Sequence, residues 1–222
     1  MTVHFNYSLQ QLHEMIGESS AKVEHAVLKA VNAVATNDPE AALAVIAGDR
    51  EIDLAENHIE EECLKTLALY QPVAGDLRQV ISILKINNEL ERAADLAVNI
   101  AERVPDIVRQ PLDSIEKIDF SDMVRLACAM LKKALDSMTY LDVVAAAEVI
   151  KEDDAVDEIH KNNYSLVKDK ILSYPSAAGY YLDCLTVSRC LERIGDIATN
   201  VAEDVIYLGS GKIVRHVHEG EP

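Results

Sequence analysis

The sequence predicts an all-α protein built as a tandem repeat of two three-helix bundles. Apolar residues recur at helical spacing along most of the 222 residues, and no stretch alternates long enough to form a strand. Proline and glycine divide the chain into segments of helical length. Residues 90–104 recur at residues 191–205 with nine of fifteen identities, which indicates two similar halves.

The first half is predicted to contain three helices. They span about residues 7–36, 38–69 and 74–104. The first carries a long apolar stripe over residues 9–31, and apolar residues between positions 73 and 86 open the third. Two turns separate these helices, at Asn37-Asp38-Pro39 and at Gln71-Pro72. Asn and Asp favour turns, and proline disrupts the interior of a helix.

The second half is predicted to contain three more helices. They span about residues 115–137, 142–172 and 178–208. A weak break at residues 137–142 and a stronger one at Tyr174-Pro175 separate them. The proline-flanked segment at residues 105–114 is expected to link the two halves. The predicted domains are therefore residues 1–108 and 109–222.

The composition narrows the class of protein. Apolar residues make up 49% of the chain, which is enough for a sizeable core, and the formal net charge is −17. Such a charge argues against direct binding of nucleic acid or of an anionic membrane surface. The amino terminus lacks a basic start and an apolar signal core, and no run approaches the length of a membrane span. A cytoplasmic protein without membrane insertion is expected.

The four cysteines do not suggest a metal or redox site. Cys63, Cys128, Cys184 and Cys190 show no Cys-x-x-Cys spacing. They are expected to be reduced and mostly buried thiols.

Each copy of the repeated segment carries a polar stripe. The stripe consists of Glu91, Asp95, Asn99 and Glu102 in the first copy and of Glu192, Asp196, Asn200 and Glu203 in the second. These positions fall within roughly 80° of arc on one helix face. Leu, Ile, Val and Ala occupy the opposite faces and are suited to packing against other helices.

A second acidic pair precedes each stripe on the neighbouring helix. In the first half, Asp53 and Glu91 are equally distant from Pro72, as are Asp49 and Asp95. In the second half the same relationship holds for another set of four, whose midpoint is 174.5, beside Pro175. This set is Asp153, Asp157, Glu192 and Asp196. Residues equidistant from the turn of a helical hairpin lie level, so each hairpin is expected to bring four carboxylates together.

Four level carboxylates repel one another, and burial adds to the cost. A bound cation resolves this repulsion. Oxygen donors without cysteine suit hard cations such as Mg²⁺, Mn²⁺ or Ca²⁺, and carboxylate clusters also hold iron. The candidate ligands are Asp49, Asp53, Glu91, Asp95, Glu102, Asp153, Asp157, Glu192, Asp196 and Glu203. Asn99 and Asn200 are candidates for the surrounding residues that hydrogen-bond to the ligands. The alternative is an exposed acidic face for a basic partner.

Other candidate sites are weaker. A di-iron site of the ferritin type requires a repeated Glu-x-x-His motif, and the closest match is Asp157-x-x-His160. It has no counterpart in the first half, so His160 is expected on ordinary helix surface. No nucleophile with a plausible base and no phosphate-binding loop is present, so the chain is predicted not to be an enzyme. Gly195 inside the second stripe is compatible with a close approach of helices.

The repeated segments resemble the paired signature of the PhoU family of phosphate-transport accessory regulators. The resemblance extends to residues 48–53 and 151–157, which look like the family's acidic segments, and to the hairpin motif at residues 71–78. Residues 211–217 resemble the family's exit from the last helix. In the first repeat Ala93-Ala94 replaces the usual Ile-Gly, while the acidic residues and Arg92 are kept.

The resemblance implies two three-helix bundles with multinuclear metal sites, holding divalent or trivalent iron, manganese, magnesium or zinc ions, and frequent homodimers. It also implies an adaptor that links a phosphate ABC transporter, through a PstB-like ATPase, to a PhoR-like sensor histidine kinase. Such an adaptor represses phosphate uptake and starvation signalling when phosphate is plentiful. Two roles are open for Arg78. It has a local role, capping the hairpin or pairing with acidic residues such as Asp76, or it contacts a partner protein.

Two other functions stay open. One is a metal-dependent hydrolase of phosphoesters or polyphosphate that uses the carboxylates as a multi-metal site. The other is a helical interaction module with acidic faces and no metal.

Overall fold

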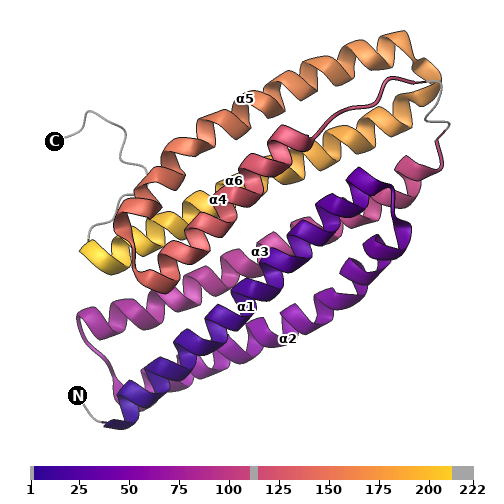
Figure 1. Cartoon of the computed structure of the whole chain (residues 1–222). Helices are drawn as coiled ribbons and strands as arrows, with labels where there is room; N and C mark the ends of the chain where they lie inside the picture. The colour runs from indigo at the N-terminus through magenta and orange to yellow at the C-terminus, as the bar shows by residue number, and fades with distance from the viewer. Residues whose placement is uncertain (1–2, 111–114, 212–222) are drawn as a thin grey trace.

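The computed structural model describes residues 3–110 and 115–211, and it confirms the all-α fold class (Figure 1). Its elements are α1 (Val3–Thr36), α2 (Pro39–Tyr70), α3 (Gly75–Val108), α4 (Ser121–Tyr140), α5 (Val143–Ser173), the 3₁₀ helix η2 (Pro175–Ala177) and α6 (Ala178–Ser210). No strand occurs in the two described ranges. None of the helices there combines the length and apolarity that a membrane span requires.

Two of the predicted turns end in well-formed caps of the helix that follows. Asp38 precedes α2 and Asp142 precedes α5. The Oδ1 atom of each accepts hydrogen bonds from the N–H groups two and three residues later, at 3.0 Å. These bonds satisfy donors that a helix start leaves free. Asn37 and Leu141, which precede the caps, turn the chain with φ angles of 53° and 50°.

Helix α3 does not end at the predicted residue 104 but continues through Pro105 to Val108. Proline lacks an N–H donor, which weakens a helix at that point. The last turn stays closed because the Arg109 N–H donates to the Pro105 carbonyl oxygen at 3.2 Å, and Ile107 is buried in the core. Residues 105–108 are therefore helix rather than linker. Residues 111–114 of the predicted linker lie outside the described residues.

Helix α4 begins at Ser121 rather than near residue 115, so the predicted start is wrong. The preceding segment is attached to the beginning of α6. The Tyr181 hydroxyl donates to the Glu116 carbonyl oxygen at 3.0 Å, and the Ile118 N–H donates to the Tyr180 hydroxyl at 3.4 Å. Ile118 is also buried. The segment before Ser121 is therefore held by contacts with α6 instead of by the hydrogen bonds of a helix.

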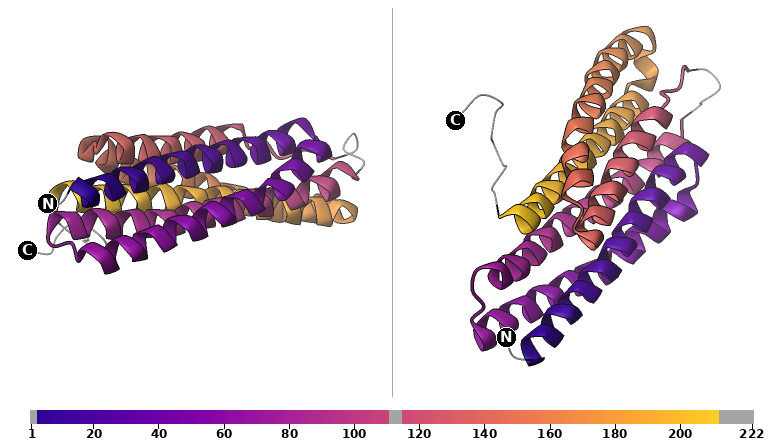
Figure 2. Two further views of the ribbon diagram at one scale, coloured as in Figure 1. Left: turned by 90° about the horizontal axis from the view of Figure 1, so that it is seen from below. Right: turned by 60° about the vertical axis from the view of Figure 1, so that its left-hand side comes forward.

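The six long helices form an elongated molecule whose two halves lie side by side (Figures 1 and 2). Helices α1, α2 and α3 pack against one another, as do α4, α5 and α6. The halves meet where α3 packs on α6 and where α1 contacts α4. Helices α2 and α5 lie on opposite outer sides of the molecule (Figure 1).

One hydrophobic cluster runs through both halves. Its largest fully buried side chains include Ile86 and Leu90 on α3 and Leu191 and Ile194 on α6. The buried faces of α3 and α6 also carry many alanines, which allow helices to approach closely. The repeated segments therefore form the centre of the molecule, and their polar stripes lie at its surface.

Candidate metal centre

The first hairpin brings Asp49 and Asp53 on α2 close to Glu91 and Asp95 on α3. Burial raises the pKa of Asp49, and the charges of Asp53 and Asp95 raise it further. The pKa of Glu91 is also raised, first by burial and then by four other carboxylates. These four are Asp95, Glu56, Asp53 and Asp49. We call Asp49, Asp53, Glu91 and Asp95 the first acidic cluster.

The second hairpin repeats this arrangement on α5 and α6. Burial and then the charges of Asp196, Asp157, Asp154 and Glu192 raise the pKa of Asp153 to about 6. The pKa of Asp196 is raised by burial and by Asp157. We call Asp153, Asp157, Glu192 and Asp196 the second acidic cluster. Both clusters carry the mutual repulsion that the level placement of carboxylates predicts.

Gly195 explains why Asp153 lies so close to α6. A Cβ atom on Gly195 would lie 3.2 Å from Asp153 Oδ1 and 3.6 Å from Val156 Cγ1. This position is buried, and the missing side chain lets α5 approach there. The equivalent residue of the first half is Ala94, whose methyl group occupies such space. The close helix approach expected at Gly195 is therefore present.

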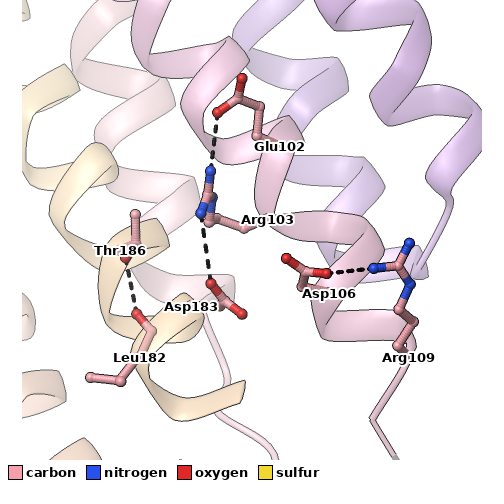
Figure 3. Close-up of polar contacts among 7 residues, drawn as sticks. All are labelled: Glu102, Arg103, Asp106, Arg109, Leu182, Asp183 and Thr186. Carbon is pink, nitrogen blue, oxygen red and sulfur yellow. Dashed lines mark hydrogen bonds and ion pairs between the residues drawn. The ribbon is translucent and has the colours of Figure 1, made fainter. Parts of the chain in front are cut away.

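Glu102 is paired with the neighbouring Arg103 (Figure 3). Its Oε2 atom lies 3.0 Å from Arg103 Nη2, and Arg103 Nη1 lies 4.0 Å from Asp183 Oδ1 on α6. Glu102 is thus part of a polar chain between α3 and α6, and its role as a metal ligand stays a prediction. Glu203, at the equivalent position of α6, is half-buried.

Asn200 joins the second stripe to the first half. Its Nδ2 atom donates to Glu89 Oε2 on α3 at 3.3 Å. The same oxygen accepts a hydrogen bond from Arg92 Nη1 at 2.8 Å, and the Arg92 charge lowers the pKa of Asp196 against the effect of burial. Asn99, the counterpart of Asn200, is exposed. The two stripes are equivalent in sequence but differ in their surroundings.

Sequence reasoning missed Glu56 and set His160 aside as ordinary helix surface, yet both lie beside the clusters. Glu56 on α2 is half-buried and raises the pKa of Glu91. His160 on α5 is half-buried rather than on open surface, and it partly offsets the rise in the pKa of Glu192 that burial and Asp196 cause. Glu56 follows Asp53 by three residues, as His160 follows Asp157. That shared spacing was the signal in the sequence that could have identified both.

The carboxylate oxygens of the two clusters are suitable ligands for a cation, although their side chains are not arranged around a single point. Within residues 3–110 and 115–211, no three His, Cys, Asp or Glu side chains converge in the geometry of a metal site. Bound metal would thus require rotation of the carboxylates, which are partly exposed and lie on two neighbouring helices. Carboxylate oxygens are the donors that hard cations prefer.

Arg78 lies at the joint between the halves. An ideal Cβ atom on Gly211 would lie 3.7 Å from Arg78 Cζ, which places the guanidinium against the carboxyl end of α6. Positive charge is favourable there because the last carbonyl groups of a helix carry partial negative charge. The Nε atom of Arg78 is buried without a hydrogen bond. A packing role accounts for this placement.

The repeated fold and the paired acidic stripes define a two-repeat helical protein of the PhoU type. The family model described as "PhoU domain" matches the chain twice, over residues 16–104 and 120–205. The chain therefore belongs to the PhoU family.

Named relatives match over nearly the whole chain. A protein of Aquifex aeolicus, the phosphate-specific transport system accessory protein PhoU homolog, is 38% identical over 211 residues and covers 95% of both chains. A homolog of the same name from Pseudomonas aeruginosa is 35% identical over 216 residues, which are 96% of this chain and 88% of the relative.

Solved structures show the same fold. The crystal structure of PhoU from Pseudomonas aeruginosa superposes with a TM-score of 0.89 at 33% identity, covering 94% of this chain and 100% of that chain. The phosphate transport system regulatory protein PhoU from Streptococcus pneumoniae superposes with a TM-score of 0.83 at 27% identity. That match covers 95% of this chain and 99% of the other.

Proposed function

We propose that this protein is an accessory regulator of phosphate transport. The observation that carries the proposal is the match of the PhoU domain to both halves of the chain. Relatives that align over nearly its whole length are named as accessory proteins of the phosphate-specific transport system. The protein is accordingly assigned a non-catalytic role.

The finer proposal is that the protein acts as a cytoplasmic adaptor. It links a PstB-like transporter ATPase to a PhoR-like sensor histidine kinase and represses uptake and starvation signalling when phosphate is plentiful. The net charge of −17 supports action through proteins rather than through DNA, because a phosphate backbone would be repelled. A partner that offers Lys and Arg suits the acidic helix surfaces, and a homodimer is part of the same proposal.

We also propose that both acidic clusters hold divalent or trivalent metal ions, with iron, manganese, magnesium and zinc as the candidates. A bound ion supplies positive charge that offsets the repulsion among the carboxylates. The raised pKa values of Asp49, Glu91, Asp153 and Asp196 support this, because burial and then neighbouring carboxylates disfavour the charged form of each group. The ligands tie α2 to α3 and α5 to α6, so binding stabilises each hairpin.

Co-purification tests the adaptor. The tagged full-length chain is recovered from native cells grown in high and low phosphate, and proteins bound to it are identified. We expect a phosphate transporter ATPase or a sensor kinase, with recovery that falls as salt rises. Specific retention of promoter DNA by the purified chain would contradict the proposal.

A turnover assay separates the adaptor from the hydrolase that uses the carboxylates as a multi-metal site. The metal-loaded protein is incubated with a model phosphoester and with polyphosphate, and the Asp95→Asn variant serves as the control. No turnover is expected. Turnover that is abolished by Asp95→Asn would show that the protein is a hydrolase rather than a non-catalytic adaptor.

A further inference from the structure

A cavity lies at the joint between the two halves and shares no residue with the acidic clusters. Its volume is about 530 Å³, within the range of ordinary ligand pockets. Its walls come from the last turns of α1, the end of α3, the segment that precedes α4, the first turns of α4 and the first turns of α6. Both halves therefore contribute to a single cavity.

The floor of this cavity is apolar and recessed. Val31 on α1, Ile107 on α3 and Val187 on α6 line it and are buried. Leu28 is 44% exposed and Phe120 is half-buried, so these two side chains lie toward the opening. A slim apolar group that reaches the floor shields these walls from water, which is favourable.

The charged residues of the cavity have the opposite balance to the acidic chain as a whole. Among the described residues that line it, Lys117 and Arg125 are exposed cations and Asp119 is the one carboxylate. Asp119 Oδ1 accepts a hydrogen bond from the Ser121 N–H at 2.9 Å, so this carboxylate is engaged at the start of α4.

Two further features favour negative charge at the opening. Arg125 Nη2 lies 3.4 Å from Asp122 Oδ1, but both side chains are exposed, so this ion pair is weak and leaves Arg125 able to bind a second anion. Ser121, the first residue of α4, also lines the cavity. The first N–H groups of a helix carry partial positive charge, which adds to that of Lys117 and Arg125.

We propose that this cavity binds a small amphiphilic anion, namely an aliphatic carboxylate. Its chain lies on the apolar floor, and its head group lies beside Lys117 and Arg125. A single chain fits better than a helix of a partner protein, because the floor residues are buried below the rim. The ligand contacts α1 of the first half and α4 and α6 of the second, so binding stabilises the joint between the halves. This property of the cavity depends neither on bound metal nor on a role in phosphate transport.

The first test compares octanoate with octanol, which has the same chain length and no charge. Calorimetry on the full-length chain is expected to show one saturable site for octanoate, and octanoate should raise the melting temperature. Lys117→Gln combined with Arg125→Gln is expected to weaken octanoate binding by about 5-fold or more and to leave octanol binding unchanged. The control pair Lys161→Gln and Arg189→Gln, at exposed positions of α5 and α6, changes the net charge equally and should alter neither.

A second variant fills the cavity. Val124→Trp, at a half-buried position of the α4 wall, is expected to abolish binding of octanoate and octanol. Ala129→Trp, at an exposed position of the same helix, should leave both intact. Circular dichroism verifies that each variant is helical. If Val124→Trp does not fold, Leu28→Trp at the rim replaces it.

Three results would overturn the inference. Absence of saturable octanoate binding to the unaltered chain would show that the cavity is not a site for such anions. Binding that persists in the filled variant would place the ligand elsewhere on the molecule. Equal affinities for octanoate and octanol, both unaffected by Lys117→Gln and Arg125→Gln, would show that the opening does not select an anion. None of these results bears on the proposed role in phosphate transport.

Discussion

Lys85 on α3 and Asp204 on α6 form an ion pair that joins the two halves, with Lys85 Nζ 3.1 Å from Asp204 Oδ1. The carboxylate is 2% exposed, whereas the lysine side chain is 42% exposed. Lys85 Nζ also lies 5.4 Å from the centroid of the Tyr207 ring, which adds a cation–π contact. A carboxylate this deeply buried depends on its hydrogen-bonding and charged partners.

Removing the lysine charge should destabilise the joint between the halves. Lys85→Met leaves the Asp204 carboxylate buried without its cation, which costs about 3–5 kcal/mol in a fully buried pair. Because Lys85 is partly exposed and solvent screens the pair, we expect about 2 kcal/mol. Urea unfolding at pH 7 measures the loss. Lys161→Met, at an exposed lysine of α5, should change the free energy of unfolding by less than about 0.5 kcal/mol; equal effects would show that the pair does not stabilise the joint.

Gly195→Ala should shift the ionisation of Asp153. The added methyl group meets Asp153 Oδ1 at 3.2 Å, so the carboxylate must shift, and we expect it to shift toward water. We expect the pKa of Asp153, about 6 in the unaltered chain, to fall toward its ordinary value of 3.8. Carboxyl ¹³C chemical shifts measured against pH follow this titration directly.

The stability of the same variant provides a second measurement. Ala is favoured over Gly inside a helix by about 1 kcal/mol. Gly48→Ala, on α2 with no heavy atom within 4 Å of the new Cβ, should show most of this gain. Gly195→Ala should show clearly less, because crowding of Asp153 and Val156 offsets it. Equal gains at both positions would mean that α5 and α6 are not in close contact there.

Without metal, the protein should lose stability as the pH rises through the titration of Asp153. The pKa of this group is about 6 in the folded chain, above the ordinary value of 3.8. Between these values the folded state keeps a proton that the unfolded state has lost, so stability falls as the pH rises from about 4 to about 6. Urea unfolding in a chelating buffer at fixed ionic strength measures the slope. Asp153→Asn should flatten it, and an unchanged slope would locate the titration elsewhere.

Asp53 and Glu91 should be coupled through metal. In the metal-free chain, Asp53→Asn and Glu91→Gln each relieve repulsion and should raise the melting temperature slightly. With Mn²⁺ or Fe²⁺ present, either change should abolish the metal-induced rise. The double variant should then lose little more than either single one, which is a non-additive result.

A matched control accompanies this cycle. Glu61→Gln, at an exposed glutamate of α2, should leave the metal-induced rise in place. Additive effects of Asp53→Asn and Glu91→Gln in the presence of metal would show that α2 and α3 do not share an ion.

The spacing of residues along the chain was sufficient to predict that there are six long helices and which acidic residues lie near one another. Apolar spacing locates the buried face of a helix, and the caps at Asp38 and Asp142 begin α2 and α5 near their predicted starts. Equal distance from a hairpin turn places Asp49 with Asp95 and Asp153 with Asp196, because two antiparallel helices rise at the same rate. The division at residues 108 and 109 stays a prediction.

Only the tertiary structure decided which groups meet beyond a hairpin. The start of α4 depends on hydroxyl groups of Tyr180 and Tyr181 that are distant in sequence. Arg103 pairs with Glu102 on its own helix, and the packing of α6 brings Asp183 to the same guanidinium. The sequence by itself determined the helices, their buried faces and the level of the carboxylates, since these follow from local periodicity. The partners of each polar side chain depend on how α3 packs on α6, which periodicity along one helix does not specify.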